Sequence, residues 1–367
     1  MTDHAELRTY ESDGLASYRC IPGLVILAES AEDVAYVVGR CAAAGVPFVA
    51  RGSGTGLSGG ALPRSDGVLI VLSRMRRIVD VDLDDERAVV QPGVINADLT
   101  KAVAADGFYY APDPSSQQVC SLGGNVAENS GGAHCLKYGF TAHHVTALEL
   151  VLPDGSIERV GGRAPDPVGY DVGGAVVGSE GTLCVVTEAT VRLLRKPQAV
   201  QTVLAGFRTI EDAGAAVSAI IAAGVLPAAI ELMDALAIEA AEAAVHPNYP
   251  AAAGAVMVAE LDGPACEVDA QLAEVQRFST TAGAFEIRVA RDDVERALIW
   301  RGRKSAFAAV GRISPDYIVQ DGVIPRTALP EVLLAIESLA AAAGIRVANV
   351  FHAGDGNLHP LVLFDDT

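Results

Sequence analysis

The stretch of sequence that most constrains the fold is residues 51–63, RGSGTGLSGGALP, which is unusually rich in glycine. The apolar run 46–50 precedes it and predicts a buried strand that leads into the stretch. Because glycine offers little to pack, the stretch must be used for its backbone, whose successive N–H groups can form a concave anion site. Side chains that could add donors to such a site for phosphate or pyrophosphate are Arg51, Ser53, Thr55 and Ser58.

Two well-known phosphate-binding patterns do not fit this stretch. A P-loop requires Lys followed by Ser or Thr at its end, and residues 51–63 contain no lysine. Gly54, Gly56 and Gly59 match the dinucleotide fingerprint GxGxxG, but that motif needs a following helix. Here Pro63 and a strand-like run at 68–72 follow instead. Two interpretations remain: a glycine-rich surface loop without a ligand, and a pyrophosphate loop between two strands.

Two further stretches have the same character. Residues 111–139 contain paired glycines and small polar residues, and residues 178–187 begin with Gly-Ser-Glu-Gly. Asn125 and Asn129 tolerate left-handed backbone angles and can hydrogen-bond a ligand. Two tight turns around a short apolar segment would explain the longer stretch without a ligand. Three such loops in one domain can instead line a ligand much longer than one phosphate, such as FAD.

Size, charge and cysteine spacing narrow the class of protein. A chain of 367 residues predicts about two domains, and its formal net charge of −19 argues against nucleic acid and anionic membrane surfaces as partners. Residues 1–20 are polar and charged, so we expect no signal peptide, and we find no apolar run of membrane-spanning length in the sequence. The six cysteines form no C-x-x-C pair, which argues against zinc and iron–sulfur sites. We therefore expect reduced cysteines and a cytosolic protein.

Hydrophobic patterning predicts an α+β organisation in two domains. Ser30 caps a predicted helix that runs to Ala44 and ends at Gly45. The other elements expected before the boundary are strands 24–28, 67–72, 78–82, 87–91 and 188–194 and helix 95–105. Lys196-Pro197 ends the last strand, so the expected domains are 1–196 and 197–367. The second alternates strands 200–206, 226–231, 255–261 and 284–290 with helices 209–223, 233–244, 265–282, 292–309 and 326–343.

A candidate metal site lies in the last stretch of interest, residues 352–359 (HAGDGNLH). Asp355-Gly356 is a strong signal for a two-residue hairpin turn. Such a turn would place His352 directly opposite His359, with their Cβ atoms about 4.5–5.5 Å apart. Two imidazoles so placed suit a divalent metal such as Zn²⁺, Fe²⁺ or Mn²⁺. The alternative is a turn whose histidines only form hydrogen bonds.

These motifs together resemble one family. RGSGTGLSGGALP, SLGGNVAENSGG, CLKYG and GSEGTLCVVTE resemble the FAD-binding domain of the vanillyl-alcohol-oxidase, or PCMH, type. WRGRKSAFAAVGRISPDYIVQDGVIPR (300–326) and NVFHAGDGNLHPLVLFD (349–365) extend the likeness to the FAD-binding subunit of bacterial glycolate oxidase. Relatives of that family include flavin D-lactate and D-2-hydroxyglutarate dehydrogenases. The resemblance implies an FAD-binding domain followed by an α+β cap domain, in which an antiparallel sheet carries helices.

The resemblance also implies a cofactor site. The cofactor-binding residues it indicates are Arg51, Gly52, Ser53, Gly54, Thr55, Gly56, Ser58, Gly59, Pro112, Asp113, Ser121, Gly124, Asn125, Asn129, Ser130, Gly131, Glu180, Gly181 and Val186. Covalent flavin attachment in this superfamily usually uses a histidine in the first loop. Thr55 stands near that position, and no histidine occurs between His4 and His134. We therefore expect noncovalent FAD.

The activity implied is oxidation of a short 2-hydroxy acid, glycolate or D-lactate, by hydride transfer to flavin N5. Arg303 matches the carboxylate-binding arginine of the 2-hydroxyglutarate relatives, and Arg326 is a second choice. A solvated charge on a helix is the alternative for Arg303. In relatives, the positions of His352 and His359 are metal ligands beside the flavin. A metal or a base is needed to remove the proton of the substrate hydroxyl. In relatives, the base is the histidine of a later Gly-Glu-His-Gly-Ile-Gly stretch, and the glutamate of that stretch is a further metal ligand.

The partners and completeness of the chain are further expectations. With no cluster motif of its own, the chain would pass electrons to an iron–sulfur subunit, a second flavin-type subunit, a quinone or a cytochrome, which could hold it at the inner membrane. Relatives continue with Gly-Glu-His-Gly-Ile-Gly, so we expect an incomplete cap domain here. The alternative function is a catalytically incomplete flavin-binding fragment. A nicotinamide-linked reductase or lactone oxidase is a third possibility, against which the pair His352 and His359 argues.

Overall fold

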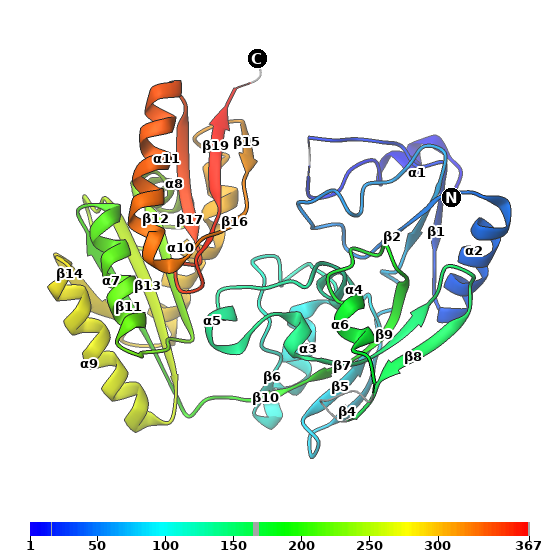
Figure 1. Cartoon of the computed structure of the whole chain (residues 1–367), viewed down its shortest axis with the longest axis horizontal. Coiled ribbons are helices and arrows are strands. Elements are labelled where there is room, and N and C mark those ends of the chain that lie inside the picture. The colour runs from blue at the N-terminus through cyan, green and yellow to red at the C-terminus, as the bar shows by residue number, and fades with distance from the viewer. Residues whose placement is uncertain (16, 164–168, 366–367) are drawn as a thin grey trace. The chain divides into compact units, whose positions relative to one another are not determined.

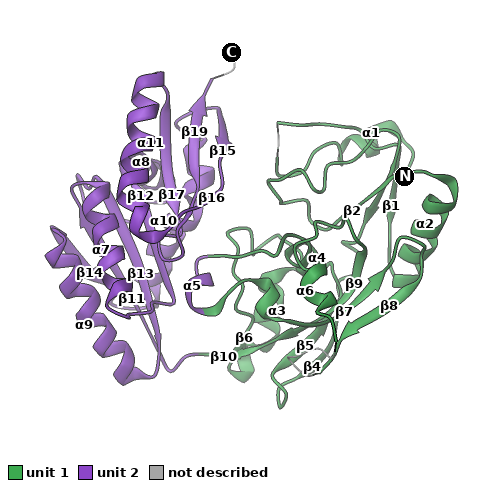
Figure 2. Cartoon of the chain, viewed as in Figure 1, with its two compact units in different colours: residues 1–132, 138–196 green, residues 133–137, 197–367 purple. Residues whose placement is uncertain are grey.

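The computed structural model describes residues 1–15, 17–163 and 169–365, and the chain divides into two compact units. Unit 1 contains residues 1–132 and 138–196, and unit 2 contains residues 133–137 and 197–367 (Figure 2). The sequence analysis predicted one domain boundary, after Lys196. The short segment 133–137, which packs with unit 2 although its neighbours in sequence belong to unit 1, is an additional feature of the structure.

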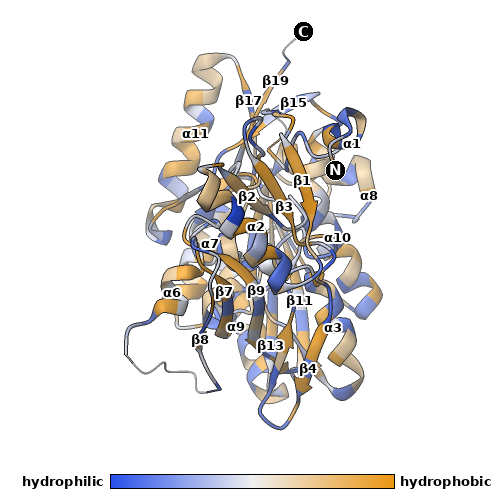
Figure 3. Ribbon diagram, turned by 90° about the vertical axis from the view of Figure 1, so that its right-hand side faces the viewer, coloured by the Kyte–Doolittle hydropathy of each residue, from blue (hydrophilic) through white to orange (hydrophobic). Residues whose placement is uncertain are grey.

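Unit 1 begins with the helix α1 (His4–Arg8; Figure 1). A three-stranded parallel sheet of order β1-β3-β2 follows (Figure 3). The elements of this part of unit 1 are β1 (Leu24–Leu27), α2 (Ala31–Ala44), β2 (Phe48–Arg51) and β3 (Val68–Val71). The bounds of α2 confirm the predicted helix, since Ser30 Oγ accepts from Asp33 N and Gly45 takes a φ of 64°. β1 and β3 are largely hydrophobic (Figure 3), and Val34 and Val38 of α2 are fully buried. No helix lies between β2 and β3, so the GxGxxG match is accidental.

The rest of unit 1 is a five-stranded antiparallel sheet of order β4-β5-β9-β7-β8 with short helices. The sheet and a two-stranded pair, β6 with β10, contain β4 (Ile78–Asp82), β5 (Arg87–Val90), β6 (Phe108–Tyr109), β7 (Val145–Val151), β8 (Ile157–Gly161), β9 (Val185–Arg192) and β10 (Leu194–Arg195). Helices α3 (Asn96–Val103), α4 (Leu122–Glu128) and α6 (Val172–Val176) bury apolar residues in the same core.

The stretch 111–139, predicted as a loop with paired glycines and small polar residues, contains two short helices, α4 and α5 (Cys135–Tyr138). Ser121 Oγ accepts from Gly124 N at 3.3 Å and begins α4. Leu122 and Val126, one turn apart, are both buried, and this packing stabilises a helix whose glycines disfavour it. Tertiary packing thus overrides the local preference that the sequence displayed.

Unit 2 is a seven-stranded antiparallel sheet of order β14-β11-β13-β12-β17-β19-β15. Its strands are β11 (Ala199–Phe207), β12 (Ala229–Asp234), β13 (Ala255–Gly263), β14 (Glu286–Val289), β15 (Asp316–Val319), β17 (Arg346–Phe351) and β19 (Pro360–Phe364). Helices α7 (Ile210–Ala222), α9 (Ala265–Thr281) and α11 (Leu329–Ala343) bury residues in one core, and α8 (Ala235–Val245) and α10 (Asp293–Val310) in another. This arrangement confirms the antiparallel, helix-carrying sheet that the resemblance implied.

The predicted hairpin register at 352–359 is wrong by two residues. The turn has four residues, 353–356, and His352 pairs with Asn357 instead of His359. Asp355 Oδ1 accepts from Asn357 N at 3.1 Å, and Gly356 takes a φ of 83°. Asn357–Leu358 forms β18, which pairs with β16 (Gly322–Val323), a distant partner that local turn rules do not include. His352 and His359 are consequently diagonal neighbours on one face.

Two smaller expectations concern cysteines and membrane segments. All six cysteines are free thiols, as predicted. Among the helices that the structure describes, none has the length and apolar character needed to cross a membrane.

Candidate functional site

The first glycine-rich loop of unit 1 presents its backbone. In the described part of the chain, no protein group accepts a hydrogen bond from the N–H groups of residues 52–61. Gly54 and Gly59 take φ values of 68° and 80°, which side-chain-bearing residues rarely adopt. A Cβ on Gly52 would overlap Ser121 Oγ, so this loop lies against the start of α4. Unpaired donors beside a helix start suit a phosphate group, which fits the expected cofactor.

Arg51 has a different role from the one expected. Its guanidinium lies under Gly54, where an added Cβ would come within 2.5 Å of it, and Nη1 donates to the Tyr10 carbonyl at 3.4 Å. Burial lowers the pKa of Arg51, although an arginine remains charged in proteins. The Arg51 side chain thus packs against the backbone of its own loop at Gly54, and its charge makes the electrostatic potential at the loop more positive.

The second stretch is held together by buried amides. Asn125 is 3% exposed, and its Oδ1 accepts from Asn96 Nδ2 at 2.9 Å. Asn96 Nδ2 also lies 3.0 Å from the Pro112 carbonyl, and Asn125 Nδ2 donates to Ser130 Oγ at 3.3 Å. Asn96 and Asn125 together therefore link Pro112 to Ser130 from inside the unit. Sequence reasoning had not identified Asn96.

Asn129 takes the left-handed conformation predicted for it, with a φ of 47°, and ends α4. Its Oδ1 accepts from Ala142 N at 2.9 Å, so part of the amide is used by the protein. Gly132 lies so close to Asp113 that a Cβ there would come within 2.5 Å of the Asp113 carbonyl carbon. Gly131 lies in the same turn region without regular structure.

The third predicted loop, which begins at Gly178, also lies against α4. Gly178 N donates to the Val126 carbonyl and Glu180 N to the Ala127 carbonyl, both at 2.9 Å, so residues 178–181 lie against α4. Glu180 and Gly181 take φ values of 54° and 72°. The structure therefore brings the predicted loops of unit 1 together around α4. Val186 differs, because its side chain packs in the core of unit 1.

Glu128 was missed by sequence reasoning. Ser58 Oγ donates to Glu128 Oε2 at 3.2 Å, which joins the first loop to α4. Burial, and after it the neighbouring Glu180 and Asp13, raise the pKa of Glu128 above its ordinary value. Two carboxylates facing Gly60 would repel a phosphate, so the unpaired N–H groups must provide the attraction at this loop.

Two of the predicted catalytic residues of unit 2, Arg303 and His352, contact a carboxylate that the sequence analysis did not single out. Glu231, on β12, is fully buried, and its Oε2 lies 2.5 Å from Arg303 Nη2 on α10. Its Oε1 and Oε2 lie 2.8 and 3.0 Å from His352 Nδ1, just after β17. Arg303 is 3% exposed, so its alternative as a solvated helix charge is wrong. The one signal in the sequence was a charged residue inside an apolar strand.

The two imidazoles lie side by side in spite of the shifted register. The ring centroids of His352 and His359 are 5.1 Å apart, with the rings perpendicular. His359 Nδ1 lies 3.4 Å from Asp321 Oδ2, and its ring lies against Phe307. Both Nδ1 atoms thus face carboxylates, which leaves the Nε2 atoms for a ligand or substrate.

The charges of Arg303, Glu231 and His352 shift one another's pKa values within the cluster. Burial opposes ionisation of Glu231, but Arg303 and His352 outweigh burial and hold the pKa of Glu231 below its ordinary range. Burial likewise lowers the pKa of His352, but Glu231 outweighs burial and raises it. His352 is therefore a stronger proton acceptor than an isolated histidine.

The histidine pair is an incomplete donor set for a metal within the described residues, where no three His, Cys, Asp or Glu side chains converge. Two imidazoles supply half of a tetrahedral shell. Metal binding by this pair therefore remains a prediction.

Arg326, the second choice for the carboxylate anchor, is exposed, and its Nη1 donates to the Gly354 carbonyl at 3.1 Å. It supports the turn that carries the histidines. It also borders a hollow of about 440 Å³ in unit 2 whose lining residues are Cys135, Leu136, Ile324, Pro325, Arg326 and Asp355.

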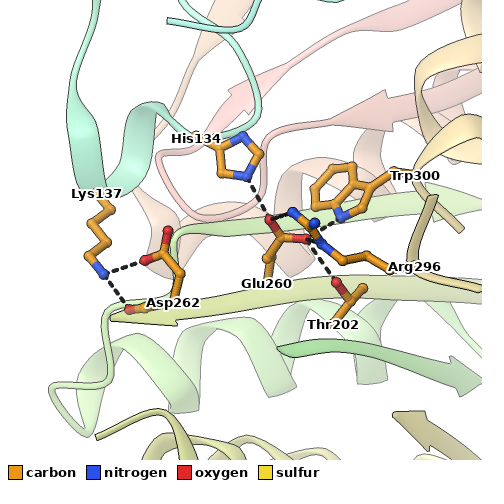
Figure 4. Close-up of polar contacts among 7 residues, drawn as sticks. All are labelled: His134, Lys137, Thr202, Glu260, Asp262, Arg296 and Trp300. Atoms are coloured by element: carbon orange, nitrogen blue, oxygen red, sulfur yellow. Dashed lines mark hydrogen bonds and ion pairs between the residues drawn. The ribbon is translucent and has the colours of Figure 1, made fainter. Parts of the chain in front are cut away.

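A second buried carboxylate in unit 2, Glu260 on β13, anchors the segment 133–137 (Figure 4). Glu260 accepts from Arg296 Nε and Nη2 at 2.9 and 2.8 Å, from Trp300 Nε1 at 2.5 Å and from Thr202 Oγ1 at 2.8 Å. His134 Nε2 lies 3.1 Å from the same carboxylate. Lys137 Nζ donates to the Asp262 carbonyl at 2.6 Å and also contacts the Asp262 carboxylate.

Comparison with known proteins assigns both parts of the chain to protein families. Residues 22–161 match the FAD binding domain model, and residues 196–367 match the FAD linked oxidases, C-terminal domain model. The loops of unit 1 and these matches define an FAD-dependent flavoprotein with a PCMH-type FAD-binding domain, and FAD is its cofactor.

The chain belongs to the FAD-linked oxidase family that includes the glycolate oxidase subunit GlcD, and it is an FAD-linked oxidoreductase. It is 51% identical to GlcD of Escherichia coli K12 over 98% of this chain and 72% of that protein. It is 38% identical to GlcD of Bacillus subtilis over 97% of this chain and 76% of that protein. A D-lactate dehydrogenase of Anaerostipes hadrus is 32% identical over 95% and 75%.

Solved structures agree on the fold. An alkyldihydroxyacetonephosphate synthase superposes with a TM-score of 0.80 at 20% identity, over 99% of this chain and 77% of the other. A 4-ethylphenol oxidase from Gulosibacter chungangensis gives 0.79 at 17% identity, over 99% and 79%. These enzymes support the predicted vanillyl-alcohol-oxidase fold, and their low identity limits the likeness to the fold.

Proposed function

We propose that this protein oxidises a short 2-hydroxy acid, glycolate or D-lactate, to the 2-oxo acid. The observation that carries the proposal is that one buried carboxylate, Glu231, contacts both a guanidinium and an imidazole, with a second imidazole beside them. A 2-hydroxy acid offers a carboxylate and a hydroxyl on adjacent carbons, and these two groups match that pair of functions. The names of the relatives support the same substrate class.

Arg303 binds the substrate carboxylate in this proposal. A guanidinium donates through several N–H groups in a fixed plane, which suits a carboxylate. Arg303 Nε is buried and has no hydrogen-bond partner among the described residues, so it retains donor capacity beyond its ion pair with Glu231. Burial strengthens its attraction for an anion, because water screens the charge less.

His352 takes up the proton of the substrate hydroxyl. Its Nδ1 is engaged by Glu231, so Nε2 is the atom that accepts. His359 lies against His352 and orients the hydroxyl from the second side, and the same two Nε2 atoms would supply two ligands if a divalent metal is bound. FAD, when bound, supplies the two-electron acceptor for the α-hydrogen, which leaves as hydride.

The reduced flavin would pass its electrons to a partner. The first relatives are named as subunits, and the chain has no C-x-x-C pair to hold its own cluster. We propose an iron–sulfur or second flavin-type subunit, or a quinone or cytochrome, as the acceptor. Such a partner could place the protein at the inner membrane from the cytosolic side.

The test is a dye-linked assay of the FAD-loaded protein with matched substrates. Glycolate or D-lactate should reduce the dye. Acetate lacks the hydroxyl and ethylene glycol lacks the carboxylate, so neither should react. NAD⁺ in place of the dye should give no NADH. Reduction by ethylene glycol as fast as by glycolate would refute the role of the carboxylate anchor.

A further inference from the structure

Glu231 is an unusual residue for its position. It lies on β12, an interior strand of the seven-stranded sheet, and none of its surface is exposed. Its neighbours two residues away on the same face, Ala229 and Met233, belong to the apolar core on the side of α8 and α10. An apolar side chain at 231 would continue that core, and replacing a buried ion pair by apolar residues is often neutral or stabilising. Stability of the fold therefore does not explain a carboxylate here.

The geometry of the carboxylate fixes a proton. An ionised carboxylate only accepts hydrogen bonds. His352 Nδ1 lies 2.8 and 3.0 Å from the two Glu231 oxygens, so Nδ1 must carry the hydrogen. Neutral His352 then has its lone pair on Nε2, because the hydrogen bond at one ring nitrogen decides which tautomer is present.

The same carboxylate also fixes the guanidinium. Glu231 Oε2 lies 2.5 Å from Arg303 Nη2, and both side chains are almost completely buried. Arg303 comes from α10 and His352 follows β17, so Glu231 connects side chains of two separate elements. One residue thus sets the orientation of both groups.

We propose that Glu231 is a positioning residue: it holds the Nδ1–H tautomer of His352, with Nε2 as acceptor, and locks Arg303 in place. This proposal rests on the proposed function of Arg303 and His352. It adds that the proton acceptor and the carboxylate anchor are coupled through one carboxylate, so that loss of Glu231 impairs both.

The first test reads the tautomer directly. The FAD-loaded protein is labelled with ¹⁵N-histidine, and the signals of His352 are assigned with His352→Gln. At a pH where His352 is neutral, Nδ1 should show the shift of a protonated nitrogen and Nε2 that of an unprotonated one. In Glu231→Gln the tautomer population should shift toward Nε2–H. An unchanged His352 spectrum in Glu231→Gln would overturn the proposal.

Glu260→Gln is the matched control. Glu260 is the other buried glutamate of the same sheet with cationic partners, and it does not contact His352. The control should destabilise the protein but leave the His352 tautomer as in the wild type. If both variants change the His352 spectrum alike, the effect is a general response to a lost buried charge, and the proposal fails.

A second variant covers the case in which Glu231→Gln does not fold. Glu231→Leu combined with Arg303→Met removes both charges and leaves no uncompensated arginine. His352 should again lose its fixed Nδ1–H tautomer in this double variant. Retention of that tautomer would show that something other than Glu231 selects it.

Kinetics give the second readout. Glu231→Gln should lower kcat/KM for the 2-hydroxy acid by about 10- to 100-fold, the usual effect of losing a residue that orients a functional histidine. kcat should fall and KM should rise together, and Glu231→Asp should restore part of both. A loss confined to thermal stability would refute the positioning role. If the wild type oxidises no 2-hydroxy acid but the tautomer result holds, the proposed function fails separately from the positioning of His352.

Discussion

His134 Nε2 lies 3.1 Å from a carboxylate oxygen of Glu260, and this contact fastens a segment that is embedded in the sequence of the FAD-binding unit to the sheet of unit 2 (Figure 4). The chain enters unit 2 at residue 133 and leaves it at 137, so unit 2 is assembled from two separate parts of the sequence. Lys137 and Asp262 form a second attachment at the other end of the segment. The segment is therefore part of the fold of unit 2.

The first prediction concerns Glu260. Burial opposes its ionisation, but hydrogen bonds from His134 and Arg296 outweigh burial and hold its pKa well below the ordinary value of 4.5. Glu260→Gln should lower the free energy of unfolding at pH 7 by about 3–5 kcal/mol, because it leaves buried cations without their anion. Urea unfolding can be followed by the fluorescence of Trp300, the one tryptophan, which donates to Glu260.

The sign of the pH effect follows from the lowered pKa. Stability from a carboxylate with a lowered folded pKa is complete above its unfolded pKa and is lost as the pH falls toward the folded pKa. The difference between wild type and Glu260→Gln should thus shrink as the pH falls below about 4.5, the ordinary glutamate value. Glu274→Gln, which breaks an exposed pair with Arg277, should leave unfolding unchanged. A difference that grows on acidification would contradict this account.

Local signals in the sequence predicted the elements well. Ser30 and Gly45 delimited α2 because capping depends only on neighbouring residues. The hairpin register failed because β18 pairs with β16, more than thirty residues earlier, and this pairing accompanies a four-residue turn. Glycine-rich α4 was missed because it is stabilised by packing that its own sequence does not display.

The candidate sites show the same division. Arg303, His352 and His359 could be named from motifs. Glu231, in contrast, is a single charged residue in an apolar strand, and the histidine to which it is hydrogen-bonded is 121 residues away in the sequence. No spacing rule connects residues so distant. Such an isolated charge in a buried strand is nevertheless a usable signal, since it requires a partner of opposite charge.

The second prediction tests the first loop. Gly56 has no positive φ, and a Cβ there would lie 3.5 Å from Glu128 Oε1, which is an ordinary contact. A valine at position 56 should therefore not strain the backbone, and any effect on FAD binding must have another cause. Gly56→Val should keep its unfolding midpoint but bind FAD at least about tenfold more weakly, because the branched side chain covers the unpaired N–H groups. Flavin absorbance and circular dichroism measure the two effects. Gly124→Val, at the start of α4, should also weaken FAD binding, because its Cβ would lie 3.2 Å from Ser121 Oγ, the group that caps α4.

Gly162→Val is the control for both glycine variants. It also lacks a positive φ, a Cβ there would point into open space, and it follows β8 outside the predicted loops. Its FAD content should equal that of the wild type. Normal FAD content in Gly56→Val and Gly124→Val would show that these loops do not bind the cofactor.

The third prediction is that FAD is bound noncovalently. No histidine occurs between His4 and His134, and Thr55 occupies the first loop near the position where attachment is expected. The purified protein should be yellow, and acid precipitation should release all of the flavin into the supernatant. Flavin that stays with the precipitated protein after washing would disprove noncovalent binding.

The last prediction separates Arg303 from its neighbours on α10. Arg303→Lys keeps the charge but replaces a planar fork by a point charge, which cannot hold Glu231 and a substrate carboxylate in one plane. KM for the 2-hydroxy acid should rise about tenfold, equivalent to about 1.4 kcal/mol, with a smaller fall in kcat. Arg301→Lys is the matched control, because Arg301 lies on the same helix but is exposed. Steady-state assays with dye as acceptor decide the matter, and equal KM values for the two variants would remove Arg303 from the substrate site.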